Sequence, residues 1–138
     1  MARIQLTKNL FLDEYIPKEL YLQYETKPWI LFGLIDARLI KADQKLRNVF
    51  GSVEINNWWL GGVRNYSGLR LPASPDFSPT SQHTFGRASD KLFDVPAQEV
   101  RDFIFAHYLL LGITCIKANV IWVHSDVRYH VSPVLLIV

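Results

Sequence analysis

The chain has 138 residues, of which 49% are hydrophobic and 13% aromatic, and its formal net charge is +2. This length predicts a single domain over residues 1–138, and the hydrophobic content excludes a disordered chain. Because the net charge is low and the basic residues are dispersed, no nucleic-acid partner is expected. No stretch approaches the roughly 20 apolar residues of a membrane span, so no membrane partner is expected either.

The first part of the chain is predicted to be helical. Short helical turns are expected at 13–16 and 18–24. From Pro28, apolar residues recur at helical spacing, which predicts one helix over 28–50 that ends at Gly51. The residues of this helix expected to be buried are Leu34, Ile35, Leu39, Leu46 and Val49. Its charged residues are expected on a solvated face, and they are Asp36, Arg38, Lys41, Asp43, Lys45 and Arg47.

Strands and one more helix are predicted in the second part. Val53 and Ile55 indicate a strand, and residues 61–82 indicate a long loop because they are rich in Gly, Pro and Ser without a period. A loop of this length in a compact domain is usually functional. The later elements are strands at 88–93, 113–117 and 120–127, a helix over 96–110, and an edge strand or partner-binding arm at 133–138. Together they predict an α+β domain with a mostly antiparallel sheet and packed helices.

Two polar clusters contain the residue types of a metal site. Residues 81–90 (SQHTFGRASD) place His83 and Asp90 seven positions apart, and WVHSDVR downstream contains His124 and Asp126. If the second cluster is a strand, His124 and Asp126 point the same way, and a buried strand rarely carries such a pair without a partner or an ion. We therefore expect His83, Asp90 and His124 to bind one divalent ion. Three protein ligands and a water are a common form of catalytic zinc site.

The remaining cysteine and histidines are interpreted as structural. A single cysteine excludes an intrachain disulfide. Cys115 lies in an apolar run, so a buried small residue is the simplest interpretation and a metal-binding thiolate is the alternative. His107 and His130 lie outside both clusters and are expected on a helix face or at the surface.

The pattern S-x-H-x-x-G-x-A-x-D followed by W-x-H-x-D-x-R resembles the M15 zinc peptidases, the group of D-alanyl-D-alanine carboxypeptidases and phage endolysins. Residues 6–15, 55–59 and 67–70 also resemble segments of the small phage-encoded members, so the resemblance covers most of the chain. It implies a single M15 peptidase-like domain with a hedgehog/DD-peptidase-like fold. It further implies a zinc ion and the hydrolysis of D-amino-acid peptide bonds in peptidoglycan.

The resemblance also implies roles for individual residues. His83, Asp90 and His124 match the zinc ligands. Arg70 matches a loop arginine that holds the substrate carboxylate or the developing oxyanion, a role that suits a guanidinium fork. An ordinary loop ion pair is the alternative interpretation of Arg70.

The catalytic base of the family is not identifiable in this sequence. Members commonly have a Glu or a second His shortly before the last ligand, where residues 117–122 read KANVIW. Asp126 is a candidate base; alternatively, the base comes from elsewhere in the chain, or the chain has kept the metal site and lost catalysis. Asp126 and Ser81 are also candidates for positions behind the ligands, where Asp126 would accept a hydrogen bond from a ligand histidine. Lys117 either faces the cleft beside His124, where it would repel the zinc ion, or points to solvent.

Two functions therefore stay open. One is a zinc-dependent peptidoglycan peptidase that acts on peptidoglycan peptides. The other is a non-catalytic phage virion protein that uses the same fold and has other virion proteins as partners. Residues 1–8 show no signal peptide, so a location in the host cytoplasm or in the virion is expected.

Overall fold

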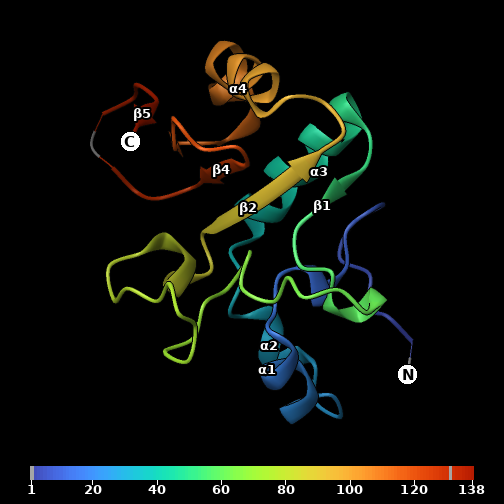
Figure 1. Ribbon diagram of the computed structural model, residues 1–138. Helices are drawn as coiled ribbons and strands as arrows, with labels where there is room; N and C mark the ends of the chain where they lie inside the picture. Colours follow the sequence, from blue (N-terminus) through green and yellow to red (C-terminus); the bar gives the residue numbers. More distant parts are fainter. Residues whose placement is uncertain (1, 131) are drawn as a thin grey trace.

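A computed structural model of the chain, which describes residues 2–130 and 132–138, contains helices and a five-stranded sheet (Figure 1). The helices are α1 (Lys18–Gln23), α2 (Trp29–Phe32), α3 (Ala37–Phe50) and α4 (Ala97–Leu111). The strands are β1 (Val53–Glu54), β2 (Ala88–Phe93), β3 (Cys115–Ile116), β4 (Val123–Asp126) and β5 (Leu136–Ile137). Short 3-10 turns are η1 (Leu12–Glu14), η2 (Trp58–Leu60) and η3 (Gln82–Phe85). The α+β prediction is confirmed, and several strands are shorter than predicted.

The sheet is mixed. Its strand order is β1-β2-β4-β3-β5. The pairs β1–β2, β2–β4 and β3–β4 are antiparallel, whereas β3 and β5 are parallel. The parallel pair arises because the chain leaves β4, reverses, and returns beyond β3 at the edge of the sheet. The last apolar run is therefore an edge strand, one of its two predicted forms.

The predicted helix over 28–50 is wrong in its middle. The chain forms α2 and α3 with a break between them, although the apolar spacing continues through it. Asp36 begins α3, because its side chain accepts a hydrogen bond from the backbone N–H of Arg38 (2.9 Å). The backbone N–H of Asp36 donates to the carbonyl of Gly86 (2.9 Å). This hydrogen bond therefore connects the start of α3 to the turn that follows His83.

The break also changes which residues of this segment are buried. Ile35, Leu39 and Leu46 are buried as predicted. Leu34 is 38% exposed and Val49 is 51% exposed, so those two predictions are wrong. After the break at 33–36, α3 follows its own helical register, in which Leu39, Ala42, Asp43 and Leu46 form the inward face. Val49 falls outside that face.

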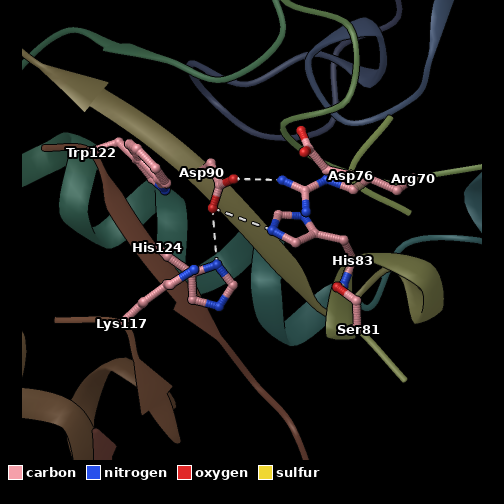
Figure 2. A pocket seen from close by; sticks show the side chains of 8 residues that line it. All are labelled: Arg70, Asp76, Ser81, His83, Asp90, Lys117, Trp122 and His124. Carbon is pink, nitrogen blue, oxygen red and sulfur yellow. Dashed lines mark hydrogen bonds and ion pairs between the residues drawn. The ribbon is translucent and has the colours of Figure 1, made fainter. Parts of the chain in front are cut away.

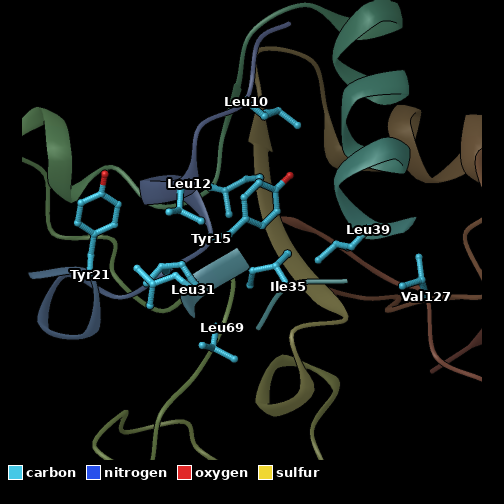
Figure 3. Packing of buried hydrophobic residues seen from close by; sticks show 11 residues of the cluster. Leu10, Leu12, Tyr15, Tyr21, Leu31, Ile35, Leu39, Leu69 and Val127 are labelled. Atoms are coloured by element: carbon cyan, nitrogen blue, oxygen red, sulfur yellow. The ribbon is translucent and has the colours of Figure 1, made fainter. Parts of the chain in front are cut away.

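Helices α3 and α4 pack on one face of the sheet. The residues of this packed layer are Ala42, Leu46, Val100, Ile104, Leu111, Ile113, Ile116, Val123 and Leu135. A second cluster joins the N-terminal segment to α2, α3 and the residue after β4 (Figure 3), and it includes Leu10, Leu12, Tyr15, Tyr21, Leu31, Ile35, Leu39, Leu69 and Val127. Full burial of one such side chain stabilises the fold by about 1.5–3 kcal/mol. These layers fix one face of β2 and β4, and the other face is open to a cleft.

One charged residue of α3 is buried, which contradicts the prediction of a fully solvated face. Asp43 accepts hydrogen bonds from the hydroxyls of Tyr15 (2.8 Å) and Ser89 (2.7 Å), and lies 3.1 Å from the ammonium of Lys91. Asp43 and Lys91 are both 0% exposed. The prediction failed because the sequence shows a charge at position 43 but not its partner on β2.

The predicted loop over residues 61–82 contains no helix or strand up to residue 81, and Gln82 begins η3. It runs beside β2, where the backbone N–H of Asp90 donates to the carbonyl of Ser67 (2.7 Å). Within the described chain, no helix has both the length and the apolar character needed to cross a membrane.

Candidate metal centre

Three elements distant in sequence bring the predicted ligands together. His83 lies in η3, Asp90 in β2 and His124 in β4. Asp90 and His124 are directly opposite each other in the antiparallel pair β2–β4, so their side chains leave the same face of the sheet. This is the face that does not pack against α3. The turn η3 then adds His83 from the end of the long loop.

The three side chains converge on one point. Nδ1 of His124 lies 2.9 Å from Oδ1 of Asp90, and Nε2 of His83 lies 3.3 Å from the same oxygen. One ligand atom from each residue can be chosen so that all lie within 4.8 Å of one another, and all three residues are buried. Two imidazole nitrogens and one carboxylate oxygen can hold a metal ion, and this donor set suits zinc. The predicted ligand residues therefore lie together.

The outer nitrogen of each histidine is bound to the protein. Nδ1 of His83 lies 2.8 Å from the carbonyl of Gly68, and Nε2 of His124 lies 2.9 Å from Oδ2 of Asp126. Carbonyl and carboxylate acceptors of this kind fix the tautomer and orientation of metal-binding histidines. His83 thus presents Nε2 to the cluster, and His124 presents Nδ1.

Asp126 lies behind His124 and not in the cleft. It is 0% exposed, and both of its oxygens accept hydrogen bonds from Arg128 (2.8 and 2.7 Å). Burial alone would raise the pKa of Asp126, but hydrogen bonds from Arg128 and His124 outweigh it and lower that pKa to about 2. Its position matches the predicted acceptor for a ligand histidine. As a base, Asp126 would have to act from the far side of the imidazole ring.

Burial and hydrogen bonds shift the pKa values of the three clustered residues. Burial lowers the pKa of His83. Burial also opposes ionisation of Asp90, but hydrogen bonds from His124 and His83 outweigh it and hold the Asp90 pKa well below its usual range. Burial would lower the pKa of His124, yet hydrogen bonds to Asp126 and Asp90 raise it. These hydrogen bonds therefore favour the ionised form of Asp90, and metal binding would compete with protonation of His124.

Arg70 is part of this cluster. Its Nη2 lies 2.8 Å from Oδ2 of Asp90, and its Nε donates to the carbonyl of Tyr66 (3.0 Å). These two nitrogens therefore bind Asp90 in β2 and a loop carbonyl. Because a guanidinium has five N–H groups, the pairing leaves others for a ligand.

The cluster forms one wall of an open cavity of about 410 Å³ (Figure 2). The lining residues are Arg70, Asp76, Ser81, His83, Asp90, Lys117, Trp122 and His124. Its size is in the range of small-ligand pockets. Lys117 therefore adopts the cleft-facing orientation, one of its two predicted orientations. Asp76 was missed because the loop that carries it has no period from which a side-chain direction could be inferred.

Two glycines let backbone segments pack closely around His83. Gly86 follows the turn with φ +67°, and a Cβ there would lie 1.8 Å from the carbonyl oxygen of Leu34. Gly68, whose carbonyl holds His83, would place a Cβ 2.5 Å from the carbonyl oxygen of Tyr15. Any side chain at either position would displace the segments that orient His83.

The other cysteine and histidines lie outside the cluster. Cys115 is buried, and burial raises the pKa of its thiol to about 12, which disfavours a thiolate ligand. His107 is exposed on α4 and stacks near Phe103. His130 is partly buried, with Nε2 at 3.1 Å from the carbonyl of Thr114.

Comparisons with protein-family models, with curated proteins and with solved structures found no match.

Proposed function

We propose that this chain is a zinc-dependent peptidoglycan peptidase with an M15-like, hedgehog/DD-peptidase-like fold. The observation that carries the proposal is the group of His83, Asp90 and His124 at an open cavity, with the outer nitrogen of each histidine bound to the protein. Zinc fits because two histidines and one carboxylate leave a fourth position for water. The substrate is a peptide of the bacterial wall that contains D-amino acids, a proposal that rests on the sequence resemblance.

The chemistry divides between the ion and the chain. A bound zinc ion would lower the pKa of a water molecule to about 7 and polarise the scissile carbonyl. Asp90 is paired with Arg70, and Asp126 keeps His124 oriented through Nε2. The N–H groups of Arg70 that are not bonded to Asp90 or Tyr66 face the substrate carboxylate or the developing oxyanion.

Asp76 is a better candidate for the general base than Asp126. A base must reach the reacting water, directly or through one other water. Asp126 is buried behind His124 and bound to Arg128, whereas Asp76 is exposed and lines the same cavity as the ligands. We therefore assign the base role to Asp76.

The alternative function, a non-catalytic virion protein, is favoured by one observation. Lys117 lines the cavity beside His124, in the region where the related peptidases are expected to have an acidic residue. An ammonium group cannot accept a proton, and it weakens zinc binding by repulsion. Under this alternative the cavity binds a ligand without cleaving it.

Metal analysis combined with digestion of purified cell walls distinguishes the two functions. The peptidase proposal predicts zinc in the wild type, digestion that is lost with His83→Ala, and a loss of about 10²–10⁴-fold with Asp76→Asn at unchanged zinc content. Zinc without digestion, together with a gain of digestion in Lys117→Glu, would support the non-catalytic alternative. Loss of digestion in Asp126→Asn at full zinc occupancy would return the base role to Asp126.

A further inference from the structure

Lys117 is a direct neighbour of the cluster across the sheet. The register Cys115↔Asp126 and Ile116↔Ser125 continues to Lys117 and His124, and the backbone N–H of Lys117 donates to the carbonyl of His124 (3.3 Å). Directly opposed residues point to the same face, with Cβ atoms about 4.5–5.5 Å apart. Asp90 occupies the equivalent position on the other side of His124.

The result is a row of three side chains across three adjacent segments. A carboxylate, an imidazole and an ammonium group lie side by side, and all three line the cavity. Figure 2 shows the Lys117 side chain extending toward the imidazole of His124. His124 thus has a negative partner on one side and a positive neighbour on the other.

The ammonium group has no carboxylate partner within the described chain. Asp90, the nearest acid in the row, has Oδ2 bound to Arg70 and Oδ1 facing both histidines. Asp76 is the other acid of the cavity lining, and Figure 2 shows it beside Arg70, across the cluster from Lys117. The cation is therefore available to an anion that enters the cavity.

We propose that Lys117 binds a carboxylate group of a peptide ligand in this cavity and thereby selects ligands by charge. This inference deepens the proposed function and rests on its metal centre. An ammonium group offers three hydrogen-bond donors, and the walls of a partly enclosed cleft strengthen its attraction for an anion. Trp122 and the His124 ring form such walls beside it.

The test measures binding to zinc-loaded protein, not turnover. Wild type, Lys117→Met, Lys117→Arg and the control Lys41→Met are titrated by calorimetry with N-acetyl-D-alanine and with its uncharged amide. Lys41 is the matched control because it is exposed on α3, away from the cavity. Lys117→Met should weaken binding of the acid by about two- to fivefold, since charge pairs near the surface are of this strength. Lys117→Arg and Lys41→Met should bind as the wild type does.

Two further measurements identify which carboxylate of the ligand is bound and whether charge is responsible. The α-amide of N-acetyl-D-glutamic acid carries its carboxylate on the side chain, so a comparison with N-acetyl-D-alanine tells a side-chain source from a chain terminus. The difference between wild type and Lys117→Met should shrink as salt is raised, because salt screens exposed charges. Binding of the uncharged amide should not change in Lys117→Met.

Zinc content, measured in each sample, separates the possible failures. Equal affinity of wild type and Lys117→Met for the acid, at full zinc content, would overturn the role of Lys117 and leave the metal centre intact. A wild type that takes up no zinc would overturn the metal centre of the proposed function. If Lys117→Met loses affinity for the acid but not for the amide, and the wild type digests no wall material, the role of Lys117 is supported. Only the proposed peptidase activity is then contradicted.

Discussion

Lys91 in β2 and Lys117, the residue after β3, lie on opposite faces of the sheet and have opposite surroundings. Lys91 points from β2 toward α3, is 0% exposed, and bonds to Ser89, Ser125 and Asp43. Lys117 lies opposite His124 on the other face, is exposed, and has no ion pair within the described chain. The charge of Lys91 is therefore paired within the protein, whereas the charge of Lys117 can interact with a ligand in the cavity.

The same strands produce both environments because side chains alternate along a strand. Ser89, Lys91 and Ser125 point to the covered face, whereas Asp90 and His124 point to the cavity. A buried charge is tolerated when it is paired and hydrogen-bonded. Charges on the covered face therefore serve the fold, and charges on the cavity face can serve a ligand.

The largest expected effect comes from removing one partner of the buried ion pair between Asp43 and Lys91. Asp43→Ala leaves Lys91 buried without its carboxylate, and should lower the free energy of unfolding by about 3–5 kcal/mol. Urea denaturation measures the change. Asp94→Ala, at an exposed position, is the control and should change stability by less than about 0.5 kcal/mol. The double variant Asp43→Leu with Lys91→Met should recover much of the loss; a single variant as stable as the control would show that the pair is not important.

The next effect concerns Glu14, a buried acid that, unlike Asp43, forms no ion pair with a lysine among the described residues. Burial raises the pKa of Glu14 from its usual value of 4.5 to about 7. Because the fold favours the protonated form, this group's contribution is fully present below pH 4.5 and is lost as the pH rises to 7. Glu14→Gln mimics the protonated form, so above pH 7 it should be more stable than the wild type by up to about 3 kcal/mol.

Unfolding free energies measured between pH 4 and 8 check this prediction. The advantage of Glu14→Gln should be near zero at the acid end and should grow through the window from 4.5 to 7. Glu99→Gln, exposed on α4, should show no such growth. A constant difference across the whole range would mean that Glu14 does not titrate as described.

The smallest of these effects is a change in zinc affinity, and it comes from a residue behind the metal centre. Asp126→Asn keeps the shape of the residue but removes the carboxylate that accepts from Nε2 of His124. Zinc affinity should fall by about 10–100-fold, as expected when the partner of a ligand histidine is changed. Competition with a chelator of known affinity measures it, with Asp102→Asn as the control. Unchanged affinity would mean that Asp126 supports the local fold and not the metal centre.

The cluster could be predicted from the sequence because its residues fall in two short segments. His83 and Asp90 share one short segment, and His124 and Asp126 follow strand alternation. The register of β2 against β4 then places Asp90 opposite His124. The ends of α3 and α4 were predictable for a similar reason, since Gly51 and Gly112 end them with positive φ.

Other features depend on contacts between distant segments and could not be predicted. The break before α3 is fixed by Asp36 and by a backbone bond to Gly86, which lies far along the chain. Burial of Asp43 depends on Lys91, and neither residue identifies the other in the sequence. Asp76 reaches the cavity from a loop whose path is set by its turns and not by a repeating pattern.

Zinc stoichiometry is the most direct test of the central claim. Protein purified without chelator and supplied with zinc should contain close to one zinc ion per chain, and saturating zinc at about 1,000 times its Kd should add about 4 kcal/mol to the free energy of unfolding. His83→Ala and His124→Ala should lose both effects, whereas His107→Ala, at an exposed position outside the cluster, should keep both. A folded wild type that binds no zinc, with a melting temperature unmoved by zinc or chelator, would contradict the metal centre.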